Sequence, residues 1–217
     1  FLFVTLVLSA AEPAPTLRRN TVDEVIAAMT PEEKVLMVIG NKNNDRRRYI
    51  GEGSTWYCAR LGLMPTVMCD GPAGVRMKPF RDGDSTKAYY STAFPTATAL
   101  AATWNTELVE TVGDAVLLAP AMNIQRDPLC GRNFEYYSED PLLSGKMGAA
   151  MVRGIQSQGV GTSVKHFAAN NQESNRKGVN AVISQRALRE IYLRGFEIAI
   201  REAAPWTVMS SYNRLNG

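Results

Sequence analysis

Charged and aromatic side chains gather in the stretch Gly131-Arg132-Asn133-Phe134-Glu135-Tyr136-Tyr137-Ser138-Glu139-Asp140-Pro141. It follows the polar segment Asn123–Pro128 and the apolar run Leu117–Ala121. The stretch shows neither the two-residue period of a half-buried strand nor the 3.6-residue period of a surface helix, so we interpret it as a loop. Charges in such a loop are paired, solvated or directed at a ligand. The stretch is therefore either a structural ion-pair network or part of a functional site.

Around this loop, short apolar runs alternate with longer amphipathic segments. Leu143, Met147, Met151 and Ile155 recur every four residues behind Asp140-Pro141, which predicts a helix that Gly159 ends. We predict strands at residues 65–69, 117–123, 161–166, 179–183 and 206–212. This alternation of strand and helix predicts an α/β fold with a parallel sheet.

Further helices are predicted from their start signals. Thr21 with Glu24, and Thr30 with Glu33, have the spacing of capping boxes. Another helix is predicted behind Ser184. Its face is expected to carry Leu188, Ile191, Gly195, Phe196 and Ala199, with Glu190–Arg194 and Glu197–Arg201 as ion pairs.

Polar residues follow the predicted strands at their carboxyl ends, where parallel sheets bind ligands. Asp70 follows residues 65–69, and Tyr212 ends residues 206–212. Lys165 and His166 close residues 161–166. A lone His166 would be read as a satisfied core histidine, but lysine is seldom buried without a partner. The adjacent pair therefore favours a functional site.

Composition limits the partners and cofactors. The chain has 217 residues, a net charge of +3 and a single histidine. Its three cysteines match no metal spacing, so we expect no metal and no cofactor. A Cys58–Cys69 disulfide is left open. Without a basic tract interleaved with aromatic residues, we expect no nucleic-acid partner. The oligomeric state is not predictable from these features.

Two further expectations concern segments of unusual sequence. Residues 1–8 are apolar but too short to span a bilayer, and Ser9-Ala10-Ala11 resembles a signal-peptidase site. We predict a partial signal peptide at residues 1–12, a secreted or periplasmic protein and no membrane attachment after its removal; an apolar first strand is the alternative. The predicted helix Asn105–Val116 runs into the next strand without a turn, which indicates missing sequence near Val116.

Four ordered motifs resemble the first domain of glycoside hydrolase family 3. Met68–Arg76 resembles its D-G-P-x-G-x-R element, Gly131–Pro141 its G-R-N-F-E-Y-Y-S-E-D-P signature, Val164–Asn171 its K-H-F-x-x-N element and Val208–Gly217 its V-M-x-S-Y-N-x-x-N-G element. The resemblance implies a (β/α)8 TIM-barrel-like N-terminal domain. Residues 13–217 would form this domain incompletely, truncated before barrel closure, without the family's second α/β sandwich domain.

The resemblance also implies an activity and a site. The activity would be that of a retaining exo-β-glycosidase of the β-glucosidase type, which removes terminal non-reducing β-D-glucosyl residues. Asp70 would hold the hydroxyls farthest from the scissile bond, and Arg176 would reach toward the 2-hydroxyl. The substrate-binding residues implied are Asp70, Arg132, Lys165, His166, Arg176, Met209 and Tyr212. Glu135, Asp127 and Glu139 would orient the arginines.

Departures from the family pattern keep other functions open. The nucleophilic Asp and the acid/base Glu are expected after Gly217, so residues 1–217 alone would be inactive. No second histidine follows His166, which disfavours the N-acetylhexosaminidase branch. A β-xylosidase of the same family, a non-catalytic sugar-binding module and a structural protein remain alternatives, and linkage and aglycone preference are not predicted.

Overall fold

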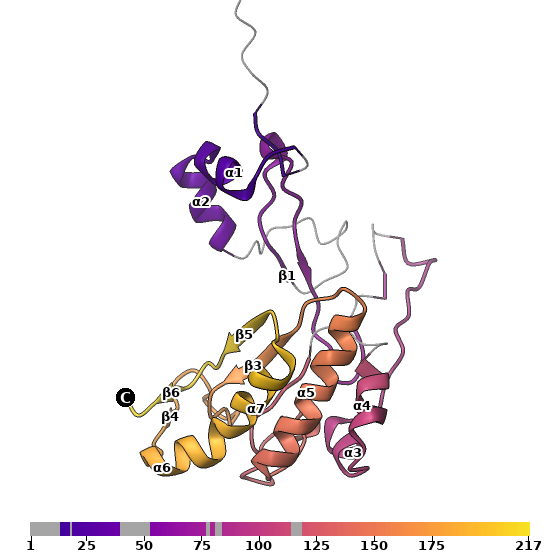
Figure 1. The fold of residues 1–217 in the computed structure, drawn as a ribbon. Helices are drawn as coiled ribbons and strands as arrows, with labels where there is room; N and C mark the ends of the chain where they lie inside the picture. The colour runs from indigo at the N-terminus through magenta and orange to yellow at the C-terminus, as the bar shows by residue number, and fades with distance from the viewer. Residues whose placement is uncertain (1–13, 18, 40–52, 77–78, 81–83, 114–118) are drawn as a thin grey trace, which may run out of the picture. The chain divides into compact units, whose positions relative to one another are not determined.

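The computed structural model describes residues 14–17, 19–39, 53–76, 79–80, 84–113 and 119–217 (Figure 1). The chain divides into two compact units, one of residues 1–49 and 53–67 and the other of residues 50–52 and 68–217. The expected signal peptide at residues 1–12 and the missing sequence expected near Val116 lie outside the described residues, so both stay predictions.

The first unit contains two short helices, and both begin at the predicted capping boxes. At α1 (Val22–Ala28), the Thr21 hydroxyl accepts from the Glu24 backbone N–H, and the Glu24 carboxylate accepts from the Thr21 backbone N–H. Thr30 and Glu33 repeat this arrangement at α2 (Pro31–Val38). The 3-10 turn η1 (Ala59–Leu61) belongs to the same unit, and β1 (Gly53–Ser54) pairs with β2 (Val67–Met68), whose second residue belongs to the second unit.

An ion pair ties α2 of this unit to the η1 turn. Arg60 Nη2 lies 2.6 Å from Glu33 Oε2, and Cys58 Sγ donates to Glu33 Oε1 at 3.3 Å. The hydrogen bond from Arg60 is the main reason that the pKa of Glu33 falls to about 2. The buried core beneath this contact consists of Val25, Met29, Cys58 and Leu61.

The second unit is an α/β structure. Its helices are α3 (Ala97–Ala101), α4 (Thr106–Gly113), α5 (Pro141–Ser157), α6 (Gln185–Ala187) and α7 (Arg194–Ala203), with the 3-10 turn η2 (Asn133–Glu135) and the π-helical turn η3 (Leu188–Tyr192). Its strands are β3 (Ser163–Phe167), β4 (Asn180–Ala181), β5 (Thr207–Ser210) and β6 (Arg214–Leu215).

Three neighbouring parallel segments confirm the predicted sheet direction. β3 pairs in parallel with β5, from Ser163 opposite Thr207 to Lys165 opposite Met209. On the other side of β3, Ala121 forms a parallel bridge with Lys165. Among the described residues β5 pairs with β3 alone, so these strands form an unclosed part of a barrel-like sheet. The expectation that residues 65–69 join the parallel strands is wrong, because β2 pairs with β1.

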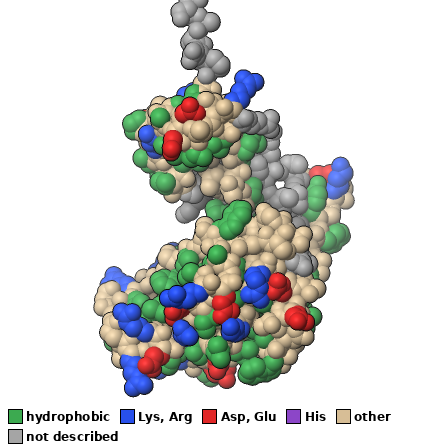
Figure 2. All heavy atoms as spheres, viewed as in Figure 1, with side chains coloured by type: hydrophobic (Ala, Val, Ile, Leu, Met, Phe, Trp, Pro, Cys, Tyr) green, Lys and Arg blue, Asp and Glu red, His purple; other side chains and the backbone are tan. Residues whose placement is uncertain are grey.

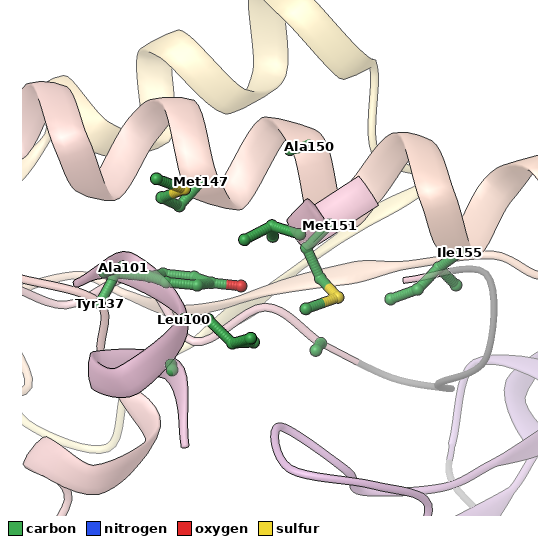
Figure 3. Packing of buried hydrophobic residues seen from close by; sticks show 10 residues of the cluster. Leu100, Ala101, Tyr137, Met147, Ala150, Met151 and Ile155 are labelled. Atoms are coloured by element: carbon green, nitrogen blue, oxygen red, sulfur yellow. The ribbon is translucent and has the colours of Figure 1, made fainter. Parts of the chain in front are cut away.

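Helix α5 is the centre of the second unit's core, as its periodicity predicts. The Asp140 side chain accepts hydrogen bonds from the backbone N–H groups of Leu142 and Leu143 and caps the helix. Figure 3 shows the side chains of Met147, Met151 and Ile155 directed from α5 toward Leu100 and Tyr137. All ten residues of this cluster are buried: Ala97, Leu100, Ala101, Val109, Ala119, Tyr137, Met147, Ala150, Met151 and Ile155.

The helix predicted after Ser184 is interrupted by a π-helical turn. Ser184 caps α6 as expected, but η3 precedes α7. Tyr192 is 6% exposed and Ile191 is 39% exposed, so the prediction of Ile191 on the buried face is wrong. A π turn adds a residue to the helical repeat and rotates the face that points inward.

The surface ion pairs of this helical segment differ in part from the expected ones. The predicted Glu197–Arg201 pair is present at 3.0 Å. The predicted Glu190–Arg194 pair is replaced by Arg186–Glu190 and Arg194–Glu197, at 3.0 and 2.8 Å. On the face of the second unit in view, basic and acidic side chains are interspersed (Figure 2).

Two findings bear on the membrane and disulfide expectations. No helix in the described parts of the chain is long and apolar enough to cross a membrane. Cys58, Cys69 and Cys130 are buried and form no disulfide, so the bridge left open between Cys58 and Cys69 is not formed in this structure.

Close packing of α5 against α7 gives a test of this core. A Cβ added at Gly145 would lie 2.7 Å from Ile198 Cβ, closer than such contacts allow. We expect Gly145→Ala to destabilise the protein by about 1–3 kcal/mol in urea unfolding, because a packed helix interface cannot absorb the methyl group.

The matched control is Gly195→Ala on α7. A Cβ there meets its nearest atom, Pro141 O, at 3.5 Å, an ordinary contact. Alanine favours the helix over glycine by roughly 0.5–1 kcal/mol, so this variant should be neutral or more stable. Equal losses in the two variants would contradict the assigned packing of α5 on α7.

Candidate functional site

The site is built around Lys165, in the middle of the parallel strands. The Met122 backbone N–H donates to Lys165 O at 2.7 Å, and the Lys165 N–H donates to Pro120 O at 3.0 Å. Met209 lies opposite Lys165 on β5. Backbone pairing on both sides therefore fixes where the Lys165 side chain begins.

The Lys165 ammonium lies between two carboxylates. Nζ donates to Asp70 Oδ1 at 3.3 Å and lies 3.5 Å from Glu135 Oε2. The side chains of Lys165 and Glu135 are 4% and 2% exposed, whereas that of Asp70 is 44% exposed. A buried ammonium requires such partners because its desolvation is costly. Asp70 keeps an open side toward solvent.

The loop that carries Asp70 forms a tight turn that requires a glycine. Arg76 N–H donates to Asp70 O at 2.7 Å and closes the turn. Gly74 within it has φ +119, and a Cβ there would lie 2.2 Å from Thr92 O. Only glycine fits this backbone, which explains the second glycine of the D-G-P-x-G-x-R element.

Arg132 continues the network from Glu135. The η2 turn places both side chains on one side of the loop, and Arg132 Nε donates to Glu135 Oε1. Arg132 Nη1 also lies 4.0 Å from Glu173 Oε1. Burial is the largest single influence and lowers the pKa of Arg132, but the hydrogen bond to Glu135 and the nearby charges of Glu135, Tyr136 and Glu173 together outweigh it, so the pKa is raised. Arg132 is thus held as a cation within reach of two carboxylates.

Glu173 joins Arg132 to Arg176. Arg176 Nη1 lies 3.0 Å from Glu173 Oε2, and its guanidinium lies over the Tyr212 ring, 4.7 Å from the ring centroid. Asn170 Nδ2 donates to Glu173 Oε1 at 3.1 Å. The Arg176 guanidinium is therefore held at its edge by Glu173 and across its face by Tyr212.

His166 is fixed through its backbone and is electrically neutral. Its N–H donates to Asn123 Oδ1, and its carbonyl accepts from Asn123 Nδ2, both at 2.9 Å. Burial, followed by the charges of Arg132, Lys165 and Arg176, lowers the pKa of His166 to about 3. Its Nδ1 is buried and has no partner within the described residues. The ring can accept or donate one hydrogen bond without carrying charge.

The structure brings the seven residues predicted for substrate binding into one network. The seven residues are Asp70, Arg132, Lys165, His166, Arg176, Met209 and Tyr212. Six of them are linked through side-chain contacts or backbone pairing around Lys165, and His166 is the next residue in the chain after Lys165. Three cations alternate with three carboxylates along the chain Asp70, Lys165, Glu135, Arg132, Glu173 and Arg176. Such a site offers hydrogen-bond donors and acceptors without surplus charge.

The predicted orienting residues are only partly correct. Glu135 does orient Arg132. In the described part of the chain, Asp127 instead accepts from the Leu129 N–H, and Glu139 accepts from the Ser138 hydroxyl. Glu173 is the carboxylate that the sequence interpretation missed, although its spacing of three residues from Arg176 is a weak signal. Within the described residues, no three His, Cys, Asp or Glu side chains form a group that could hold a metal ion.

Comparison with known proteins identifies the family to which the chain is similar. Residues 80–217 match the family described as glycosyl hydrolase family 3 N terminal domain. Thermostable beta-glucosidase B of Acetivibrio thermocellus is 44% identical over 210 residues, which cover 90% of this chain and 26% of that protein. The exo-alpha-(1->6)-L-arabinopyranosidase of Bifidobacterium breve is 46% identical over 182 residues, covering 76% of this chain and 24% of that protein.

A solved structure shares the fold at higher identity. Beta-glucosidase 3B from Thermotoga neapolitana in complex with glucose superposes with a TM-score of 0.84 and 53% identity, over 90% of this chain and 30% of that chain. The chain spans about a quarter of the length of the curated relatives described above.

Removing the buried carboxylate should destabilise the protein. Glu135→Gln leaves the Lys165 ammonium without its buried counter-charge, so we expect a loss of about 3 kcal/mol or more in urea unfolding. Glu110→Gln is the control: Glu110 and Arg153 form a pair at 2.8 Å with side chains 41% and 39% exposed, and its loss should cost under about 1 kcal/mol. Similar losses of stability in the two variants would show that the ion pairs of Glu135 contribute no more than an exposed surface pair.

The neutral state of His166 predicts a pH dependence of stability. The unfolded chain binds a proton near the ordinary value of about 6.5, whereas folded His166 binds it only near 3. The contribution of neutral His166 to the free energy of unfolding is therefore complete above about pH 6.5 and is lost as the pH falls toward 3. Between pH 7 and pH 4, the unmodified protein should lose about 3 kcal/mol more than His166→Gln, which lacks the chain's single histidine. Parallel pH dependences of the two proteins would contradict a neutral, buried imidazole.

Proposed function

The chain belongs to glycosyl hydrolase family 3, and we propose that it forms the sugar-binding part of a β-glucosidase. The observation that carries this proposal is the alternation of three carboxylates with three cations around Lys165. Vicinal hydroxyls both donate and accept hydrogen bonds, so alternating acceptors and donors suit a neutral pyranose. An anionic ligand such as a phosphate would instead favour a surplus of positive charge.

Each site residue has a proposed role that follows from its chemistry. The half-exposed Asp70 carboxylate accepts from the hydroxyls farthest from the scissile bond. Lys165 and Arg132 donate to ring hydroxyls, the neutral His166 adds one hydrogen bond, and Arg176 donates to the 2-hydroxyl. Met209 and Tyr212, both exposed, provide the apolar surface that a sugar ring packs against, and Tyr212 positions the nucleophile through its hydroxyl.

The chemical step needs residues beyond this network. Retaining hydrolysis requires a nucleophilic carboxylate and an acid/base carboxyl group about 5 Å apart. We propose that Asp70, Glu135 and Glu173 supply neither group, since each contacts a cation. The network would then hold the sugar while other carboxyl groups of the complete enzyme cleave the glycosidic bond.

The substrate class has a second candidate with an observation in its favour. A relative 46% identical over 76% of this chain is named an exo-alpha-(1->6)-L-arabinopyranosidase. L-Arabinopyranose, like xylose, lacks the hydroxymethyl group of glucose. A pentopyranoside therefore remains an alternative substrate, for an α-L-arabinopyranosidase or for a β-xylosidase. The same proposal includes three further expectations: residues 1–12 are part of a signal peptide, the protein is secreted or periplasmic, and it has no nucleic-acid partner.

The test of this function is the kinetics of Asp70→Asn in the complete enzyme. We expect nitrophenyl β-D-glucoside to be a better substrate than the β-D-xyloside or the α-L-arabinopyranoside. Loss of the Asp70 charge removes hydrogen bonds worth about 2–4 kcal/mol in the transition state, so kcat/KM should fall roughly 30- to 1000-fold.

Asp84→Asn is the matched control. Asp84 is bonded to Thr86 and paired with Lys87, so its replacement should leave kcat/KM unchanged. A higher rate on either pentopyranoside would favour the second candidate. Sugar binding without turnover would indicate a non-catalytic module, and an unchanged Asp70→Asn rate would remove Asp70 from the site.

A further inference from the structure

Glu173 uses both oxygens of its carboxylate within the network. Oε2 lies 3.0 Å from Arg176 Nη1. Oε1 accepts from Asn170 Nδ2 at 3.1 Å and faces Arg132 Nη1 at 4.0 Å. One carboxylate therefore contacts both arginines that the proposed function assigns to sugar hydroxyls.

The carboxylate is itself fixed by a buried frame. Asn170 is buried, and its Nδ2 also donates to the Tyr136 hydroxyl at 3.1 Å. Tyr136 donates in return to Asn170 O at 3.1 Å and is fully buried. Burial raises the pKa of Tyr136, so its hydroxyl keeps its proton and remains a donor. The position of Glu173 is thus set from the protein interior.

Arg176 needs this support because its own segment offers little. It lies in the turn-rich stretch between β3 and β4, and its side chain is 39% exposed. Its guanidinium also lies over the face of Tyr212, which is itself exposed. Stacking on a ring restrains the guanidinium plane, whereas the hydrogen bond to Glu173 fixes its direction within that plane.

We propose that Glu173 is a positioning residue that holds Arg176, and with it Arg132, ready for the hydroxyls of the sugar. The inference rests on the proposed glycosidase function for its kinetic consequence, but the restraint on Arg176 is a property of the protein alone. Glu173 acts through the arginines and takes no part in bond making or breaking. Preorganised donors avoid the cost of ordering a long side chain when the ligand binds.

Glu173→Gln in the complete enzyme tests this role with two substrates. Glutamine preserves the size of the side chain and removes the charge that holds Arg176. On nitrophenyl β-D-glucoside, kcat/KM should fall about 10- to 100-fold, the usual effect of losing a residue that orients a binding group. On the 2-deoxy-β-glucoside, which lacks the hydroxyl assigned to Arg176, the change should stay within about threefold of the unmodified enzyme, because the pair with Glu135 still holds Arg132.

Glu190→Gln serves as the control because it removes an exposed carboxylate paired with Arg186 at 3.0 Å. This variant should leave kcat/KM unchanged on both substrates. A Glu173→Gln loss of the same size on both substrates would indicate a general structural role and overturn the proposal. Complete loss on both, restored by added azide, would identify Glu173 as the nucleophile and overturn it as well.

A measurement without substrate separates this inference from the proposed function. The side-chain 15N–1H nuclear Overhauser effect of Arg176 Nε should report a rigid guanidinium in the unmodified protein and a mobile one in Glu173→Gln. An unchanged signal would overturn the role of Glu173 even in an active glycosidase. If the unmodified enzyme cleaves no glycoside, the proposed function fails, and this measurement still decides whether Glu173 holds Arg176.

Discussion

The burial of the Lys165 ammonium is the constraint on which the rest of the site depends. An isolated buried charge costs several kcal/mol, so the fold accommodates Lys165 only where Asp70 and Glu135 both reach it. Asp70 is 95 residues away in sequence, and the contact therefore joins distant parts of the second unit. Because Pro120 and Met122 fix the backbone of Lys165 on one side and β5 pairs with it on the other, the ammonium has little freedom to find other partners.

Exposure rises along the branch of the network that runs from Lys165 through Glu135 to Arg176, while Asp70 on the other side of Lys165 is open to solvent. Glu135 is buried with Lys165, Arg132 and Glu173 are partly covered, and Arg176 is the most open of the cations. The interior members supply rigidity, since their geometry is set by desolvated ion pairs. The exposed members keep free donor and acceptor capacity for a ligand. A site built in this order is already arranged before a ligand arrives, which reduces the ordering cost of binding.

The parts of this structure that depend on local sequence were predictable, and those that depend on tertiary contacts were not. The capping box at Thr21, the helix behind Asp140 and the polar ends of the parallel strands follow from periodicity and turn chemistry. The π turn before α7 leaves no signal in the spacing of apolar residues. Sequence proximity suggested Asp127 as an orienting residue, but direction in a loop is set by folding, and Glu173 from a different loop takes that place.

The neutral imidazole of His166 limits how this network can respond to pH. Histidine is the side chain whose ordinary pKa lies between pH 5 and 8, and here burial and three nearby cations lower the pKa to about 3. His166 therefore stays neutral across the range in which a histidine would normally titrate. A retaining glycosidase needs one carboxyl group that donates a proton and another that attacks the sugar. The carboxylates of this network accept hydrogen bonds from cations instead, which suits holding the hydroxyls of a sugar in place while separate groups change their protonation.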